Sequence, residues 1–242
     1  MKKEIKWEPL PKDQFFNILK KTKIDVFVDV GCGSHDTLSK LITKMSKKPK
    51  KSYGFEAEPT NYKEAKGWHK KNENINVYHY AVTDFTGKTT LYVQPSKKSS
   101  HSVKKYNNAH LECEVNCTRL DDWAVSEKVK KIDFIKTDTQ GSDYEVLDGC
   151  GDLLDTVKLT LIEVWFMEGS YKETKLFDEV VKIMNDHGLS LYCLKKIKLN
   201  NKDDSMRWGE ACFYRKKDFP KFKPVVSKRV KEWLKEKGLK KW

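Results

Sequence analysis

The sequence lacks several features that would assign it to common protein classes. It has no apolar run near the roughly 20 residues of a membrane-spanning helix, and its first residues lack the apolar segment of a secretory signal. Its six cysteines are scattered, without the spacing of a disulfide framework or a metal site. No Pro-, Ser- or Gly-rich linker and no internal repeat divides the chain. We therefore expect one cytoplasmic domain over residues 1–242, with reduced thiols and no metal.

Arginine is also scarce, although the net charge is +13. The four arginines are Arg119, Arg207, Arg215 and Arg229, so the positive excess comes from lysine. Proteins that read nucleic acids usually rely on arginine for bidentate contacts with phosphates and bases. A lysine-rich surface can instead reflect solubility, or attract anionic substrates over a distance. A nucleic-acid partner stays open but is less favoured than a small-molecule one.

A third absence concerns a glycine in the motif that opens the predicted sheet. Residues 26–30 are apolar except for Asp29 and predict a buried strand, which ends in the turn of Gly31 and Gly33. A dinucleotide-binding turn needs a third glycine, in G-x-G-x-x-G, but Asp36 stands there and would repel a pyrophosphate. S-adenosylmethionine has no phosphate and carries a sulfonium and an ammonium. The turn therefore favours this cofactor.

Acidic residues also stand at the ends of the next two predicted strands. Glu56 lies near the end of the strand predicted over residues 52–58, and Asp84 ends the strand predicted over residues 75–84. A carboxylate after the second strand is where α/β nucleotide sites bind ribose hydroxyls. These acids are expected at one edge of the sheet, next to the glycine turn.

The rest of the chain predicts further strands, helices and a polar loop. The loop of residues 95–110 contains Ser100 and His101, and a strand from Ile132 ends at Asp138. Strands are also expected over residues 87–94, 114–120, 157–165, 189–199 and 209–215, and helices from residue 120, over 142–147 and over 172–187. Apolar residues at helical spacing predict a basic amphipathic helix over about residues 225–240.

Seven segments in this order resemble the FkbM family of S-adenosylmethionine-dependent methyltransferases. They are FVDVGCG, YGFEAEP, YAVTDFTG, TRLDDW, IDFIKTDTQGSDYEVLDG, LIEV and GEACFYRK, within residues 26–216. The resemblance implies an α/β fold with a doubly wound, mostly parallel seven-stranded sheet, its last strand antiparallel, and a core over about residues 24–217. The strands on either side of the polar loop add an extra β-hairpin. The implied reaction is O-methylation of a sugar, glycan or similar hydroxyl acceptor.

The same resemblance implies roles for individual residues. The methionine part of the cofactor would lie against Asp29, Gly31 and Gly33. Its ribose would bind Glu56, and its adenine edge Val82 and Asp84. Asp138 would face the reacting centre. The chain departs from the family pattern at Gln140, where many members carry glutamate, and this shifts any acid–base role to Asp138.

A hydroxyl is a poor nucleophile until its proton has somewhere to go, so a general base is expected near the acceptor. Asp138 is the first candidate, and the alternative is that it caps the helix that begins at Ser142. His101 is the second candidate base, because it lies in a loop that could cover the acceptor. Ser100 and Glu163 are the predicted acceptor contacts.

Two other functions stay open on the sequence alone. An RNA 2′-O-methyltransferase would need a lysine–aspartate–lysine–glutamate arrangement around the ribose. Lys136, Asp138, Lys195 and Glu163 could supply it, although nothing in the sequence fixes their relative positions. The other alternative is a module that binds S-adenosylmethionine without catalysis.

Overall fold

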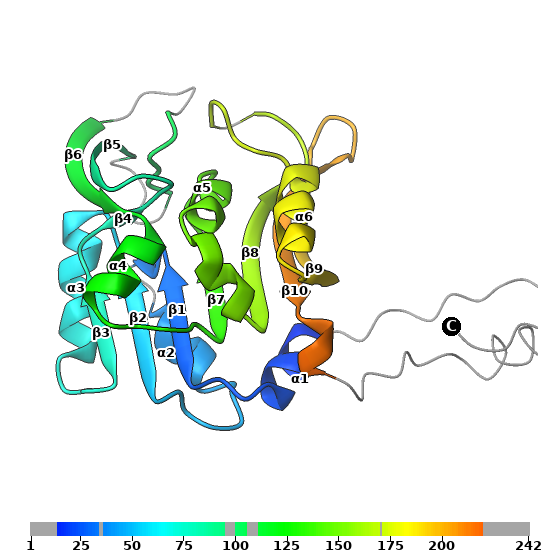
Figure 1. Ribbon diagram of the computed structural model, residues 1–242. Helices are drawn as coiled ribbons and strands as arrows, with labels where there is room; N and C mark the ends of the chain where they lie inside the picture. Colours follow the sequence, from blue (N-terminus) through cyan, green and yellow to red (C-terminus); the bar gives the residue numbers. More distant parts are fainter. Residues whose placement is uncertain (1–13, 34–35, 95–99, 106–110, 170, 220–242) are drawn as a thin grey trace, which may run out of the picture.

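The computed structural model describes residues 14–33, 36–94, 100–105, 111–169 and 171–219 of the chain. A seven-stranded sheet runs through its centre, with helices on both faces (Figure 1). In spatial order the strands are β3 (Ile75–Tyr78), β2 (Lys51–Phe55), β1 (Val26–Val30), β7 (Phe134–Thr137), β8 (Leu159–Trp165), β10 (Met206–Tyr214) and β9 (Ser190–Leu199).

The directions of the strands define a doubly wound sheet. Neighbouring strands from β3 to β8 pair in parallel, whereas β10 is antiparallel to both β8 and β9. The strand order reverses at β1, because β2 follows on one side and β7 lies on the other. In open α/β sheets the ligand site lies at the carboxyl ends of the strands beside such a reversal. The predicted sheet with its last strand antiparallel is confirmed.

Two helical layers bury the two faces of the sheet. The helices α1 (Gln14–Lys21) and α2 (Thr37–Ile42) pack on one face. The helices α4 (Leu120–Ser126), α5 (Asp143–Asp148) and α6 (Phe177–Asp186) pack on the other. In β1 the alternation of a strand sends Val28 and Val30 toward the second layer, and therefore Phe27 and Asp29 toward the first. The helix α3 (Pro59–His69) lies against β3 at the edge, and two short 3₁₀ segments, Gly151–Thr156 and Lys216–Asp218, follow α5 and β10.

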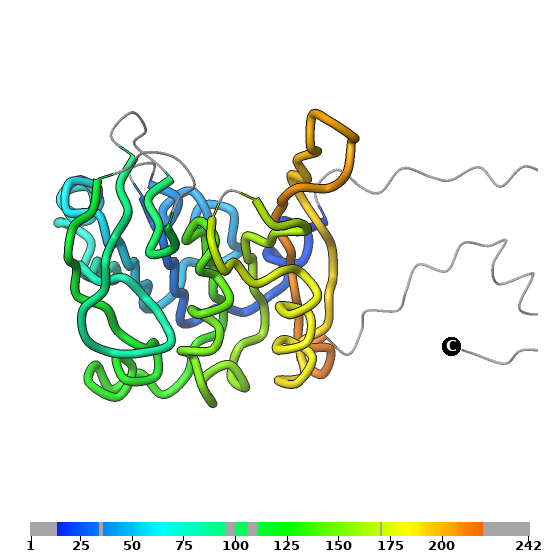
Figure 2. The backbone as a smooth tube through the Cα atoms, turned by 90° about the horizontal axis from the view of Figure 1, so that it is seen from above, coloured from blue at the N-terminus to red at the C-terminus, as the bar shows by residue number. Residues whose placement is uncertain are grey.

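A second, smaller sheet stands beside the carboxyl ends of the parallel strands. Its strands are β4 (Ala81–Val82), β6 (Leu111–Thr118) and β5 (Gly87–Val93), in that spatial order. β5 and β6 are antiparallel, which confirms the predicted extra hairpin, and β4 joins β6 in parallel. Figure 2 looks down on this end of the molecule and shows the small sheet on one side and the β9–β10 hairpin on the other.

Several predicted elements have other bounds in the structure, and three of these differences have a clear cause or consequence. The strand expected over residues 75–84 is broken after Tyr78, because β4 leaves the large sheet for the small one. The strand expected over residues 52–58 ends at Phe55, so Glu56 lies just beyond it. The helix expected from residue 172 begins at Phe177, because the Glu179 carboxylate accepts a hydrogen bond from the amide of Leu176 and caps that turn.

No helix within the described ranges is long and apolar enough to span a membrane. The helix predicted over about residues 225–240 lies outside the described residues.

Candidate functional site

A cavity opens at the carboxyl ends of β1, β2 and β7, where the strand order reverses. The segment of residues 100–103, which follows β5, also lines it. Its lining includes seven predicted site residues, namely Gly31, Gly33, Glu56, Val82, Ser100, His101 and Asp138. The structure therefore brings most of the predicted cofactor and catalytic residues to one place.

Gly31 makes the close contact between the ends of β1 and β7. Its φ is +72°, and a Cβ added there would lie 2.1 Å from the backbone oxygen of Asp138. The Gly31 amide donates to the carbonyl of Phe55 at 3.0 Å, which fixes the turn to β2. Gly33 has a φ of +60°, but no atom lies within 4 Å of its missing Cβ. Gly31 thus permits a tight backbone contact, whereas Gly33 leaves space at the cavity.

Glu56 presents a buried carboxyl group to the cavity. Its two oxygens accept hydrogen bonds from the amides of Gly33 at 2.8 Å and Glu58 at 2.9 Å, and the residue is only 7% exposed. Burial raises the pKa of Glu56 to about 7, although the two amide hydrogen bonds lower it. The amides fix the orientation of the carboxyl group, and each oxygen keeps a lone pair for a ligand hydroxyl.

Beneath the glycine turn, Asp29 and Lys136 form a buried ion pair. Asp29 is fully buried, and its Oδ1 lies 3.1 Å from Lys136 Nζ on the neighbouring strand β7. The Thr37 hydroxyl donates to Asp29 Oδ2 at 2.7 Å. Burial raises the pKa of Asp29, and Lys136 opposes this rise. Asp29 therefore lies next to the Gly31 turn, paired with Lys136, and is not part of the cavity lining.

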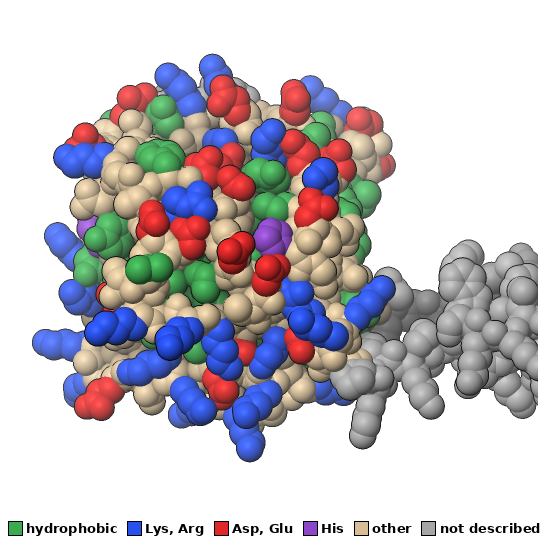
Figure 3. All heavy atoms as spheres, viewed as in Figure 1, with side chains coloured by type: hydrophobic (Ala, Val, Ile, Leu, Met, Phe, Trp, Pro, Cys, Tyr) green, Lys and Arg blue, Asp and Glu red, His purple; other side chains and the backbone are tan. Residues whose placement is uncertain are grey.

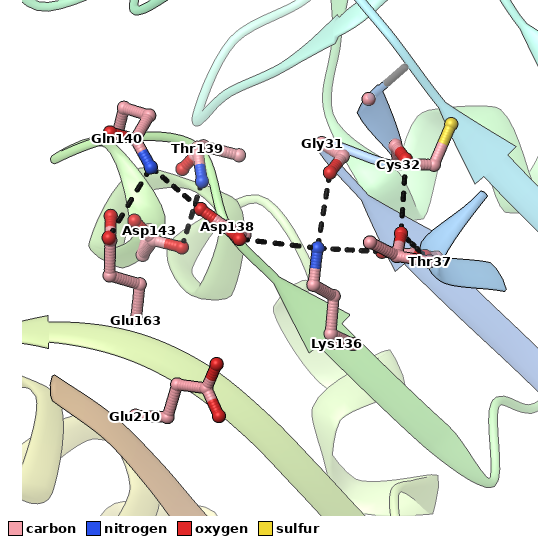
Figure 4. A network of polar contacts seen from close by, with 12 residues as sticks. Gly31, Cys32, Thr37, Lys136, Asp138, Thr139, Gln140, Asp143, Glu163 and Glu210 are labelled. Atoms are coloured by element: carbon pink, nitrogen blue, oxygen red, sulfur yellow. Dashed lines mark hydrogen bonds and ion pairs between the residues drawn. The ribbon is translucent and has the colours of Figure 1, made fainter. Parts of the chain in front are cut away.

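Lys136 also connects the glycine turn to Asp138 (Figure 4). Its ammonium group donates to the Gly31 carbonyl at 3.1 Å and lies 3.7 Å from Asp138 Oδ2. Burial disfavours this charge, but the carboxylates of Asp29 and Asp138 outweigh burial and raise the pKa of Lys136. The buried side chain therefore stays charged.

Asp138 lies just beyond β7 and is the most open of the acids in this network. Its side chain is 41% exposed, and its Oδ1 accepts a hydrogen bond from Gln140 Nε2 at 2.8 Å. Gln140, at φ +57°, also donates to Glu163 Oε1 at 3.3 Å and accepts from the Tyr171 hydroxyl at 2.7 Å. The N-cap residue of α5 is Ser142, so Asp138 does not cap that helix.

Two acids behind Asp138 are buried. Asp143 is 3% exposed and Glu163 is 6% exposed. Burial raises the pKa of Asp143 to about 7, and burial together with the nearby Asp138 and Asp143 raises the pKa of Glu163 well above its usual value. The ionised form of Glu163 is therefore disfavoured. It lines a second cavity next to the first, and the two cavities share Asp138 and Gln140.

Several hydrogen bonds and an ion pair hold the segment of residues 100–105 in place beside the cavity. Ser102 pairs with Tyr92 through the backbone, and its hydroxyl donates to the Gln140 carbonyl at 2.7 Å. Lys104 forms an ion pair with Glu145 of α5 at 2.6 Å. His101 is held on this segment, and burial lowers its pKa. Because its Nδ1 is buried without a hydrogen-bond partner among the described residues, a neutral His101 could accept a proton from a ligand.

Two predicted residues lie elsewhere. Asp84 is exposed and does not line the cavity, and its backbone oxygen accepts a hydrogen bond from Arg119 at 2.8 Å. Lys195, one of the four residues weighed for an RNA enzyme, lies over the rings of Phe15 and Phe16, while the adjacent Lys196 lines the second cavity.

The sequence-based prediction named Lys136 only as a candidate for an RNA enzyme and missed its pairing with Asp29. Its signal was a lysine inside an otherwise apolar strand, which needs a buried counter-charge such as Asp29. Trp208 and Glu210 of β10, which line the second cavity, were also missed because they lie about 70 residues beyond Asp138 and only the sheet brings them near. Among the described residues, no group of three or more His, Cys, Asp or Glu side chains is arranged to hold a metal ion.

Lysine and arginine side chains are distributed unevenly on the face that Figure 3 shows. They gather most densely along the edge from which the parallel strands start, away from the edge that carries the cavities.

The sheet order and the small additional sheet define a class I methyltransferase-like fold. A family model for the methyltransferase FkbM domain matches residues 8–191. The chain belongs to this family of S-adenosylmethionine-dependent methyltransferases. No curated protein sequence matches the chain significantly.

Several solved structures are similar to the chain at low sequence identity. The methyltransferase FkbM from Methylobacillus flagellatus superposes with a TM-score of 0.52 and 14% identity, over 79% of this chain and 43% of that chain. The chain thus spans less than half of that protein. Magnesium protoporphyrin IX methyltransferase from Synechocystis, solved with bound S-adenosylmethionine, gives a TM-score of 0.46 and 11% identity, over 84% and 77% of the two chains. A Streptococcus mutans protein solved with S-adenosylhomocysteine gives 0.49 and 10%, over 86% and 99%.

Proposed function

We propose that this chain transfers the methyl group of S-adenosylmethionine to a hydroxyl oxygen of a small-molecule or glycan acceptor. The observation that carries the proposal is the position of Asp138. It lines both cavities, and its carboxylate is accessible, whereas Asp29, Asp143 and Glu163 are buried. An acceptor in the second cavity would therefore meet Asp138 at the boundary with the first.

The first cavity fits the cofactor. Its polar end, at Gly31 and Gly33, has an open position where a side chain would otherwise stand. Glu56 has free lone pairs for the ribose hydroxyls, and the lining also includes the apolar side chains of Val82 and Leu91, which suit an adenine ring. Val82 is the proposed adenine contact. Asp84 would need to move into the cavity to take part, so its proposed role is the weaker of the two.

Asp138 then acts on the acceptor hydroxyl. When bound, the cofactor supplies an electrophilic methyl group on a sulfonium, which becomes a neutral thioether as the methyl group leaves. The Asp138 carboxylate orients the acceptor hydroxyl and takes its proton as the oxygen–carbon bond forms. Gln140 and Lys136 hold the two carboxylate oxygens at 2.8 and 3.7 Å, which limits the orientations that the carboxylate can adopt. Much of the rate enhancement would come from this alignment.

The test is transfer of a labelled methyl group into fractions of an extract from cells that express the protein. We compare the wild type with Asp138→Asn, which keeps the shape and removes the base, and with Asp186→Asn, an exposed acid paired with Lys182. Asp138→Asn should lower turnover by roughly 10²–10⁴, with cofactor affinity within a few-fold by calorimetry. Asp186→Asn should change neither quantity.

Four other results would refute parts of the proposal. Normal turnover of Asp138→Asn would reject the base role and make His101 the leading candidate. A parallel loss of cofactor affinity would place Asp138 in the cofactor site. Cofactor binding without transfer into any fraction would indicate a binding module, whereas transfer into RNA alone would indicate an RNA methyltransferase.

A further inference from the structure

The β9–β10 hairpin contains two cysteines that face each other. Cys193 of β9 and Cys212 of β10 are direct partners in the antiparallel pairing, so their side chains lie on the same face of the sheet. Both belong to the apolar cluster that α1 covers. Directly opposed residues of antiparallel strands have Cα atoms about 4.5–5.5 Å apart, and a disulfide spans about 4.4–6.8 Å. The two thiols can therefore be joined without a rearrangement of the strands.

The two thiols already interact. Both cysteines are free in the structure, and the Cys212 thiol donates a hydrogen bond to the Cys193 sulfur. This hydrogen bond, together with the ammonium group of Lys195, lowers the pKa of Cys193. Burial raises the pKa of Cys212. Because the thiolate is the form that attacks an oxidant, Cys193 is the nucleophile of the pair and Cys212 is the thiol that reacts second.

None of the other cysteines combines a partner with a reactive thiol. Cys193 is the only one of the six whose pKa is lowered. Burial raises the pKa of all the others, which are Cys32, Cys113, Cys117, Cys150 and Cys212. Cys113 and Cys117 of β6 lie opposite residues of β5 that are not cysteines. The hairpin pair therefore differs from the rest in both geometry and acidity.

The position of Cys193 in the sheet gives a small oxidant a way in. Cys193 is 8% exposed and Cys212 is fully buried. Among the described residues, β9 is the outermost strand on its side of the large sheet. Its pairing with β10 is irregular next to the two cysteines, where the register shifts between Cys212 and Phe213. Such shifts interrupt the hydrogen-bond ladder, and local openings start where the ladder is weak.

We propose that Cys193 and Cys212 form a reversible disulfide when the chain meets a hydroperoxide such as hydrogen peroxide. The Cys193 thiolate attacks one peroxide oxygen, the O–O bond breaks and hydroxide leaves, so that Cys193 becomes a sulfenic acid. The Cys212 sulfur then attacks the Cys193 sulfur. The S–S bond forms, and the sulfenic hydroxyl leaves as water with the proton of Cys212. Two thiols are oxidised and one peroxide is reduced to water, and this step does not depend on the methyltransferase function proposed above.

The bond would restrain one wall of the second cavity. Lys196, Trp208 and Glu210 line that cavity, and all three lie between the two cysteines in the sequence. The disulfide closes the segment that contains them into a loop, which limits the freedom of that segment when the sheet opens. Oxidation of the pair therefore makes the hairpin more rigid, and with it this part of the cavity.

The first test uses the full chain without substitutions. The reduced protein is treated with hydrogen peroxide, the remaining thiols are alkylated, and the digest is mapped by mass spectrometry. A crosslink between the peptides of Cys193 and Cys212, reversed by dithiothreitol, is the expected result. The oxidised chain should show slower hydrogen exchange in β9 and β10, and its unfolding equilibrium constant in urea should be roughly tenfold lower or more.

Three results of this test would overturn the inference. The first is a crosslink through other cysteines or between two chains. The second is Cys193 as a sulfinic acid beside a free Cys212 thiol. The third is survival of both thiols under conditions that oxidise free cysteine added to the same solution.

The second test compares two variants whose fold is checked by circular dichroism. Cys212→Ala removes the second thiol, so the crosslink should disappear. Cys113→Ala is the matched control, because Cys113 is more exposed than Cys193 but has no cysteine opposite it. This control should form the crosslink with the yield of the wild type. A crosslink from Cys193 to another cysteine in Cys212→Ala, or its loss in Cys113→Ala, would contradict the proposed pairing.

Discussion

The buried pair of Asp29 and Lys136 gives the sharpest prediction about stability. Lys136→Met keeps the length of the side chain but leaves Asp29 as a charge with no exposed surface and only the Thr37 hydroxyl as a side-chain partner. Breaking a buried pair from one side usually costs about 3–5 kcal/mol. Both partners are almost fully buried, so solvent screening does not reduce this figure. The loss is a large part of the roughly 5–15 kcal/mol that stabilises a typical domain.

The pH dependence of this loss has a definite sign. The pKa of Asp29 is already raised in the folded chain, and removing Lys136 takes away a cause that lowers it. A carboxyl group whose folded pKa exceeds its unfolded value favours the folded state below the unfolded pKa, and this contribution is lost as pH rises through the folded pKa. The penalty of Lys136→Met should therefore shrink as the solution becomes acidic.

Urea unfolding followed by circular dichroism measures the effect. The double variant Asp29→Asn with Lys136→Met removes both charges and should be more stable than Lys136→Met alone. As a control, Lys88→Met breaks an exposed pair with Glu114 and should cost less than about 1 kcal/mol. A double variant no more stable than the single one would refute the claim that an uncompensated Asp29 charge is the cause.

Two further predictions concern the cofactor site. Glu56→Gln should weaken S-adenosylmethionine binding at least tenfold, because a charged hydrogen bond contributes about 1.5–3 kcal/mol. A ribose that needs the ionised carboxylate binds less tightly as pH falls through the Glu56 pKa of about 7, and calorimetry should find this dependence in the wild type but not in Glu56→Gln. Gly31→Ala should unfold the chain or greatly lower its melting temperature, because the added Cβ would lie 2.1 Å from the backbone oxygen of Asp138. Gly33→Ala should keep the fold, with a backbone strain of about 1–2 kcal/mol. It should lose affinity for S-adenosylmethionine, because the added Cβ takes up space at the cavity. Equal melting temperatures for the two alanine variants would contradict this reasoning.

Local sequence patterns predicted the central sheet well. The apolar runs of β1, β7 and β8 are fully or almost fully buried in the structure, which is why periodicity and composition located them. The break between β3 and β4 was missed because residues 75–84 have strand character throughout. Which sheet β4 joins depends on its partner β6, about 35 residues later, and this is information that no local window contains.

For the site, too, the sequence predicted some residues correctly and missed others. Residues at the glycine turn and at the ends of the strands were predicted, because a parallel sheet brings the carboxyl ends of its strands to one edge. Asp84 was placed in the site by the same rule, but the chain leaves the large sheet before it, and its backbone instead contacts Arg119. Glu210 was missed because it comes from an antiparallel strand, where a mid-strand residue can lie beside the end of its neighbour.

The buried Lys136 links the stability of the chain to the alignment of the proposed cofactor and base. The Gly31 turn and Asp138 are in direct contact because Gly31 has no side chain, and Lys136 bonds to the carbonyl of one and lies beside the carboxylate of the other. The proposed cofactor position and the proposed base are thereby held at a fixed separation by rigid strands. Methyl transfer requires reacting atoms about 3–3.5 Å apart and in line. A group that fixes both sides of that gap can affect the rate through their alignment, so we propose that Lys136 acts as a positioning residue.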